Sequence, residues 1–216
     1  MHYICDHLSC CLNCGSLWIT GQGLCFACLN KLKTKEKLKM FFAEDMKVTA
    51  LFAWTPSESD LLSYWLLSLK GGGQQRIWKY WAYRLVAEKI NVVPQHCVVV
   101  PAPPSKPGER DHAYEWAFAL AQALGADFAP CLRKTESRSQ RRASLEGRLE
   151  VEFETIENSS GLERVSSGTL WIFADDILTT GSTARAARKA LGNPLHFETW
   201  VLAQRKLSCG ASKHLL

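Results

Sequence analysis

The sequence predicts an α/β fold in which a parallel sheet is flanked by helices and preceded by a small cysteine-rich segment. Two observations predict it. From residue 48 onward, short apolar runs typical of buried strands alternate with stretches of helical spacing. Six of the nine cysteines fall within the first 28 residues. Of the 216 residues, 47% are hydrophobic and 22% are charged, which favours a sizeable core and excludes a mainly disordered or fibrous chain.

The cysteine-rich segment contains two Cys-x2-Cys pairs separated by ten residues: Cys11 with Cys14, and Cys25 with Cys28. Disulfides are disfavoured in a reducing cytoplasm, so this spacing favours a metal site. Two such pairs complete the tetrahedral shell of a structural Zn²⁺ ion. We therefore predict a small zinc ribbon whose intervening residues, 15–24, form a hairpin.

Other donors lie close to the predicted zinc ligands. Cys10 adjoins Cys11, so either thiol can reach the ion after a small shift of the chain. Cys5, His2 and His7 are further sulfur and nitrogen donors. The alternative to a metal site is a set of reduced cysteines or a redox pair. The scattered Cys97, Cys131 and Cys209 are interpreted as small core residues.

A lysine strip at residues 31–39 follows the second Cys-x2-Cys pair and holds five lysines in nine residues. One interpretation is a solvated linker helix, and the other is a surface that contacts the phosphate backbone of nucleic acid. We place a domain boundary here, with a zinc-ribbon domain and basic linker at 1–40 and the α/β domain at 41–216.

The elements of the α/β domain follow in order. Strands are predicted at 48–54, 97–100, 170–174 and 197–202. Helices are predicted from 61 to 69 after Ser59-Asp60, from 78 to 90, from 112 to 124 before Gly125, and from 183 to 191. In sheets of this kind ligands bind beyond the carboxyl ends of the strands, and the site is sought there.

The segment 170–183 carries the chemistry. Its buried strand delivers Asp175 and Asp176 to its carboxyl end, and a loop rich in hydroxyl groups leads into the next helix. That loop comprises Thr179, Thr180, Gly181, Ser182 and Thr183. Hydroxyls and N–H groups at a helix start form a cradle for phosphate. Two adjacent carboxylates repel each other unless ligand hydroxyls or Mg²⁺ lie between them. The alternative is a capped helix start beside two surface acids.

This segment resembles the phosphoribosyl pyrophosphate motif of the type I phosphoribosyltransferases, in which an apolar strand, Asp-Asp, Thr-Thr-Gly and Ser/Thr-Thr appear in this order. The resemblance implies a type I phosphoribosyltransferase-like sheet that binds phosphoribosyl pyrophosphate with Mg²⁺. Asp175 and Asp176 would be the catalytic residues and hold the ribose hydroxyls. The 5-phosphate would be bound by Thr179, Thr180, Gly181, Ser182 and Thr183.

The cysteine-rich segment and this motif together resemble the ComF family (ComFC-type proteins). Residues 69–72 resemble its Leu-Lys-Tyr-x-Gly element, and residues 100–103 resemble its Val-Pro-x-Pro pyrophosphate loop. The resemblance implies a role in DNA uptake during natural transformation, with single-stranded DNA or proteins of the competence machinery as partners.

The chain departs from the family pattern where pyrophosphate would bind. Residues 109–113 replace the stretch that normally follows the Pro-x-Pro loop, and residues 134–139 read differently from the family's later pattern. Lys106, Arg110 and Arg133 are the candidate pyrophosphate ligands. The basic segment 133–148 is interpreted as a catalytic flap, a nucleic-acid patch or a solvated loop.

Two function classes remain. The first is a Mg²⁺-dependent phosphoribosyltransferase with an unknown acceptor. The second is a non-catalytic competence factor that senses a ligand, binds single-stranded DNA or serves as a protein adaptor. No apolar run approaches the length of a membrane helix, and the N-terminus does not read as a signal peptide, so we expect no membrane insertion and a cytoplasmic protein. The net charge of +5 accommodates anionic ligands.

Overall fold

The computed structural model describes residues 10–20, 23–43, 46–56, 60–69, 75–89, 96–104, 111–135, 152–156, 162 and 165–205. The helices are α1 (Phe26–Lys33), α2 (Leu61–Ser68), α3 (Gln75–Lys89), α4 (His112–Leu124) and α5 (Ser182–Ala190). The strands are β1 (Lys39–Ala43), β2 (Met46–Trp54), β3 (Cys97–Pro101), β4 (Asp127–Phe128), β5 (Leu132–Lys134), β6 (Phe153–Thr155), β7 (Leu170–Leu178) and β8 (Phe197–Arg205).

The larger sheet has the strand order β1-β2-β8-β7-β3-β4. Only β1 pairs antiparallel within it; β2, β8, β7, β3 and β4 run parallel to one another. A separate antiparallel pair, β5 and β6, forms a short hairpin stem. The predicted α/β class, with a mostly parallel sheet flanked by helices, is therefore confirmed.

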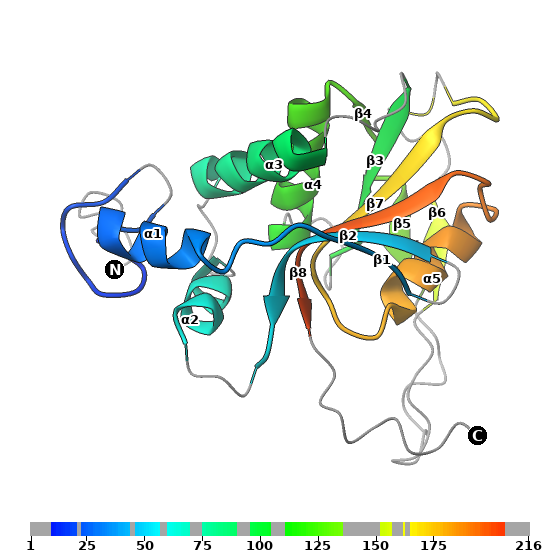
Figure 1. Ribbon diagram of the computed structural model, residues 1–216. Coiled ribbons are helices and arrows are strands. Elements are labelled where there is room, and N and C mark those ends of the chain that lie inside the picture. The colour runs from blue at the N-terminus through cyan, green and yellow to red at the C-terminus, as the bar shows by residue number, and fades with distance from the viewer. Residues whose placement is uncertain are drawn as a thin grey trace, which may run out of the picture.

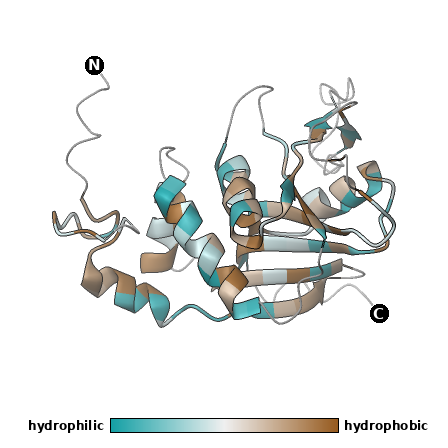
Figure 2. Cartoon of the chain, turned by 90° about the horizontal axis from the view of Figure 1, so that it is seen from above, coloured by the Kyte–Doolittle hydropathy of each residue, from teal (hydrophilic) through white to brown (hydrophobic). Residues whose placement is uncertain are grey.

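Helices cover both faces of the larger sheet. Successive residues of a strand point to opposite faces, and β7 illustrates this arrangement. Ile172 and Ala174 join the core beneath α3 and α4, whereas Phe173 joins the core with Ala184 and Ala187 of α5. Figure 1 shows α3 and α4 on one side of the sheet and α5 on the other. In Figure 2 the strands are mostly brown and white, and the helices carry teal segments.

Helix ends match the local sequence. The carboxylate of Asp60 accepts a hydrogen bond from the Ser63 backbone N–H at 2.9 Å and caps α2. Asp111 caps α4, and Gly125 ends that helix in a left-handed conformation with φ of 64°. Large aromatic side chains pack the helices against the sheet. Phe52 of β2, Trp65 of α2 and Trp81 of α3 make edge-to-face contacts with ring centroids 5.1–5.6 Å apart.

The cysteine-rich segment shares the main core. Leu24, Leu29 and Leu32 are buried in the same cluster as Trp81. Gly23 has φ of 73°, and a Cβ there would lie 2.4 Å from Cδ1 of Ile77. Only glycine fits this backbone conformation and this close approach. No strand occurs among the described residues of 10–24, although backbone hydrogen bonds join Leu12 to Gly23 and Thr20 to Leu24. Residues 21 and 22 of the expected hairpin lie outside the described part of the chain.

The lysine strip does not form one helix. Lys31 and Lys33 lie in α1, and a turn follows at Thr34 and Lys35. The backbone N–H of Lys37 then donates to the Leu51 carbonyl at 3.0 Å, and Lys39 begins β1. The linker-helix interpretation is therefore wrong, because the chain turns to pair with the sheet.

Several expectations concern residues outside the described parts of the chain. These are His2, Cys5, His7, Lys106, Arg110 and Cys209, together with residues 70–72 and 136–148. Cys97 and Cys131 are buried, as predicted for small core residues. Within the described part of the chain, every helix is too short or too polar to span a bilayer.

Candidate functional site

The two aspartates lie within β7, at the point where the neighbouring strand stops. Pro101, the last residue of β3, pairs with Ala174, and the Ala102 N–H donates to the Ala174 carbonyl at 2.9 Å. On the other side β8 continues, with Asp175 opposite Val201. The expected strand end at residue 174 is therefore wrong, since pairing with β8 carries β7 to Leu178. Asp175 and Asp176 still lie beyond the last residue of β3, so β7 is no longer paired with β3 at these two residues.

The loop after β7 turns tightly into α5. Gly181, the N-cap residue, has φ of 77°, and a Cβ there would lie 3.3 Å from Nη1 of Arg185. That nitrogen donates to the Thr180 carbonyl at 3.2 Å and ties the loop to the helix. The hydroxyls of Thr180 and Ser182 are 3.1 Å apart. Gly181 has no side chain to accept from the N–H groups of the first helical turn, which favours an anion there.

His112 is a site residue that the sequence analysis did not assign. It is the first residue of α4, and its Nε2 lies 3.3 Å from Oδ2 of Asp176. The cap formed by Asp111, which accepts from the N–H groups of Ala113 and Tyr114, fixes the start of this helix. The available signal was position, because the helix after a parallel strand begins near the carboxyl edge of the sheet.

The environment of the acid pair disfavours two negative charges side by side. Burial raises the pKa of Asp175 to about 8, and the charge of Asp176 and the hydrogen bond between the two side chains add to this effect. The backbone N–H of Asp176, which donates to Oδ1 of Asp175 at 2.9 Å, and the nearby His112 act in the opposite direction. A cation or ligand hydroxyls placed between the two side chains would relieve this repulsion and favour the charged form of both.

Asp175→Asn should stabilise the protein at alkaline pH. Between about pH 4 and pH 8 the folded state holds a proton that the unfolded state has released, so the free energy of unfolding falls as the pH rises through this window. We expect the variant to melt about 5 °C higher than the wild type at pH 8.5, on the order of 2 kcal/mol, and at a similar temperature near pH 4.

Thermal melts followed by circular dichroism across this range would check the expectation. Glu88→Gln, at an exposed carboxylate on α3, is the matched control and should not show the pH-dependent gain. A wild type and an Asp175→Asn variant that melt in parallel at every pH would contradict the raised pKa.

Of the three candidate pyrophosphate ligands, only Arg133 lies in the described residues. It is on β5, its side chain is 63% exposed, and its Nε donates to Oε1 of Glu154 on β6 at 2.6 Å. The structure thus gives Arg133 a carboxylate partner on the hairpin stem. Lys106 and Arg110 remain expectations.

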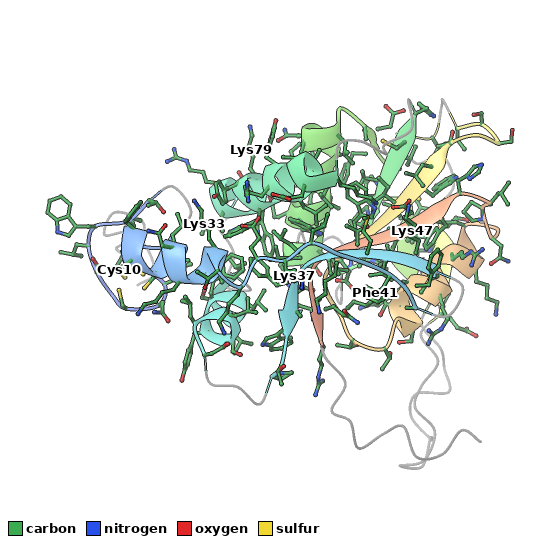
Figure 3. The ribbon with its side chains drawn as sticks, in the orientation of Figure 1. Cys10, Lys33, Lys37, Phe41, Lys47 and Lys79 are labelled. Carbon is green, nitrogen blue, oxygen red and sulfur yellow. The ribbon has the colours of Figure 1, made fainter. Side chains whose placement is uncertain are left out.

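The four predicted zinc ligands come together. The Sγ atoms of Cys11, Cys14, Cys25 and Cys28 all lie within 4.8 Å of one another, and those of Cys14 and Cys25 are 3.7 Å apart. A tetrahedral site with Zn–S bonds of about 2.3 Å has S···S edges of about 3.8 Å, so the donor set fits Zn²⁺. Cys10 is exposed and does not belong to this group. Figure 3 shows Cys10 at the α1 end of the molecule.

The local environment of the thiols also suits a cation. Burial would raise the pKa of Cys11, but hydrogen bonds from the backbone of Cys25, Cys14 and Asn13 lower it to about 6. Burial and the neighbouring thiols raise the pKa of Cys28 to about 12, despite a hydrogen bond from Asn13 Nδ2 at 3.2 Å. Several thiolates at this distance repel one another unless a cation lies between them.

Comparisons with known proteins leave the family open. No family model matches the chain, and no curated protein matches it. Among solved structures, the chain is similar to the adenine phosphoribosyltransferase of Saccharomyces cerevisiae, crystallised with D-2,5-dideoxy-2,5-imino-altritol 1,6-bisphosphate and adenine. The identity is 18% over 82% of this chain and 89% of that chain, with a TM-score of 0.41. A likeness of this extent decides neither the family nor the ligand.

Proposed function

We propose that this chain binds phosphoribosyl pyrophosphate with Mg²⁺ at the segment from Asp175 to Thr183. One observation carries the proposal. The acid pair lies where β3 has ended, and a left-handed glycine then turns the chain directly into α5. Carboxylates that accept hydrogen bonds from ribose hydroxyls thus lie close to a helix start that binds an anion. A ribose 5-phosphate requires both of these features.

Different residues of the segment would bind different parts of the ligand. Asp175 and Asp176 would accept hydrogen bonds from the ribose hydroxyls, and His112 would orient Asp176. The 5-phosphate would be bound by the loop residues Thr179, Thr180, Gly181, Ser182 and Thr183. Lys106, Arg110 and Arg133 are proposed for the pyrophosphate. Bound Mg²⁺ would neutralise part of the negative charge of the ligand.

The proposed reaction is transfer of ribose 5-phosphate to an acceptor with loss of pyrophosphate. Positive charge develops at the anomeric carbon as the bond to pyrophosphate breaks, and the acid pair would stabilise that charge. We extend the proposal to DNA uptake, and to a two-part chain divided near residue 40, on the resemblance to the ComF family.

A second candidate is a non-catalytic competence factor that senses a ligand, binds single-stranded DNA or serves as a protein adaptor. The observation that favours it is Trp18, which is 87% exposed and lies in the segment before α1, whose last turn carries Lys31 and Lys33. Exposed aromatic rings with nearby cations suit stacked bases and phosphates. One lysine of the strip, Lys35, forms an ion pair with Asp60, so its charge is already partly neutralised within the protein.

Calorimetric titration of the zinc-loaded protein with phosphoribosyl pyrophosphate and Mg²⁺ tests the first proposal. We expect a dissociation constant in the range of about 1–100 μM, and at least about 100-fold weaker binding when Asp175→Asn and Asp176→Asn are combined. Asp127→Asn is the matched control. Asp127 lies on β4, where it contacts His96, and its replacement should leave binding unchanged.

The result separates the two candidates. Wild-type protein that gives no binding would overturn the proposed site. Binding that is never followed by pyrophosphate release, across a panel of nucleobase, amine and thiol acceptors, would favour the non-catalytic candidate.

A further inference from the structure

A cavity of 560 Å³ lies between α5 and the β5–β6 hairpin stem. Figure 1 shows α5 beside β6, at the end of the sheet away from α1. Its volume lies within the range of about 300–1,000 Å³ that is typical of small-molecule sites. We call it the α5 groove. It begins at Ser182 and follows the helix to Ala190, a length of about 12 Å.

The groove exists because α5 presents small residues to the hairpin. Ala184 and Ala187 face the sheet and are fully buried, whereas Ala186 and Ala190 face the groove. Phe153 supplies the apolar wall opposite and is itself buried. The small side chains of Ala186 and Ala190 therefore leave room beside α5, where larger residues would fill the groove.

The charged groups lie along the same groove. Arg185 and Lys189 are four residues apart on α5 and therefore project from one face of the helix. Arg185 is positioned by its bond to the Thr180 carbonyl. Glu152 and Thr135 line the opposite side, where the Thr135 hydroxyl donates to the Glu152 carbonyl at 3.2 Å. The groove is thus lined by two cationic side chains, one carboxylate and the methyl groups of two alanines.

From this arrangement we propose that the α5 groove binds a phosphorylated ring compound of the size of a nucleoside monophosphate. The phosphate lies against Arg185 and Lys189, because two cations recognise a doubly charged group. The ring lies in the groove against Ala186 and Ala190, next to Phe153. An amino group on the ring donates to Glu152. The proposal does not rest on phosphoribosyl pyrophosphate binding at Asp175 and Asp176.

Adenosine 5′-monophosphate (AMP) is the probe for a calorimetric titration of the full chain. We expect a dissociation constant of about 10–500 μM for the wild type. Lys189→Glu should weaken binding by at least about tenfold, and Ala190→Phe should abolish it by filling the groove. Lys79→Glu, which makes the same charge change on an exposed residue of α3 (Figure 3), should have no effect.

A second set of titrations separates this groove from the acid pair. AMP also carries the ribose 5-phosphate group proposed for the acid pair, so the combined Asp175→Asn and Asp176→Asn variant is titrated with it. This variant should keep the AMP binding that Lys189→Glu and Ala190→Phe remove, and inorganic phosphate should bind it at least about tenfold more weakly than AMP. The proposal is overturned if AMP does not bind, if Lys189→Glu and Ala190→Phe bind it normally, if the asparagine variant loses it, or if phosphate binds equally well. Failure of phosphoribosyl pyrophosphate to bind the same protein would overturn only the proposed function.

Discussion

Glu198→Ala is expected to lower the free energy of unfolding by about 3–5 kcal/mol. The reason is the ammonium group of Lys89, which is only 4% exposed and lies against the Glu198 carboxylate, itself 8% exposed. Removal of the carboxylate leaves a buried charge without its counter-ion, and such changes are among the most destabilising single substitutions. In a chain of this size the melting temperature should fall by about 10 °C or more.

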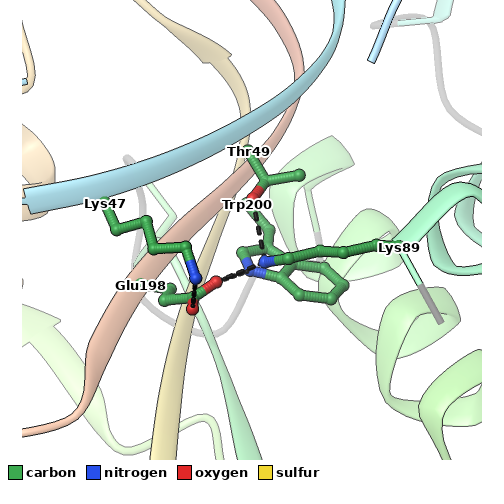
Figure 4. A network of polar contacts seen from close by, with 5 residues as sticks. All are labelled: Lys47, Thr49, Lys89, Glu198 and Trp200. Carbon is green, nitrogen blue, oxygen red and sulfur yellow. Dashed lines mark hydrogen bonds and ion pairs between the residues drawn. The ribbon is translucent and has the colours of Figure 1, made fainter. Parts of the chain in front are cut away.

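The network around this pair is shown in Figure 4. Lys89 also donates to the Thr49 hydroxyl at 2.9 Å, and its Nζ lies 3.9 Å from the centroid of the Trp200 ring. Glu198 accepts from Trp200 Nε1 at 2.8 Å and from Lys47 at 2.7 Å. The group joins β2, β8 and α3 at the start of the parallel strands, and its loss should loosen all three elements together.

Urea unfolding of three matched variants would check the prediction. Lys47→Ala removes the partner that is one-third exposed and should cost less than about 1 kcal/mol. Combining Lys89→Met with Glu198→Gln removes both charges, keeps an acceptor for Trp200, and should recover most of the loss. A Glu198→Ala variant no less stable than Lys47→Ala would contradict the buried-charge argument.

The pH dependence gives an independent check. Burial lowers the pKa of Lys89 to about 8, although Glu198 acts to raise it. Between about pH 8 and its ordinary value of 10.5 the unfolded chain binds this proton and the folded chain does not. The contribution of Lys89 to stability therefore rises with pH in that window. The Lys89→Met variant should lack this rise.

The sequence predicted the elements that have strong local signals. Apolar residues at helical spacing located α2 and α3, and Asp60 and Gly125 marked helix ends where the structure has them. The strand β7 was predicted to end four residues early. Its last residues are held by register with β8, a long-range pairing that local polarity at Asp175 and Asp176 conceals.

The sites show the same contrast between features with a local sequence signal and features that depend on long-range packing. The Cys-x2-Cys spacing located the thiol cluster because its ligands are close in the chain. His112, which reaches Asp176, comes from an element 64 positions away, and its side chain gives no local signal. The α5 groove depends on how the hairpin packs over α5, which side-chain type and spacing do not specify.

Cys28→Ser is expected to reduce the zinc content from about one ion per chain to nearly none. Loss of one of four thiolates opens the shell, and structural zinc contributes about 10–16 kcal/mol to folding in small domains. Here the site also anchors α1, whose Leu29 and Leu32 are buried in the same core as Trp81. The variant, and wild type treated with a strong chelator, should therefore melt about 10 °C or more below the zinc-loaded protein.

Elemental analysis and cobalt substitution would test the site itself. Co²⁺ in the wild type should show the intense visible bands of a tetrahedral thiolate complex, and these bands should be lost in Cys28→Ser. Cys10→Ser is the sharpest control, since Cys10 adjoins Cys11 in the chain but is exposed and outside the thiol cluster. It should keep the zinc, the cobalt bands and the melting temperature. If Cys10→Ser loses the metal as Cys28→Ser does, then Cys10 belongs to the ligand set, and the chain around the first Cys-x2-Cys pair must shift by one residue to bind the ion.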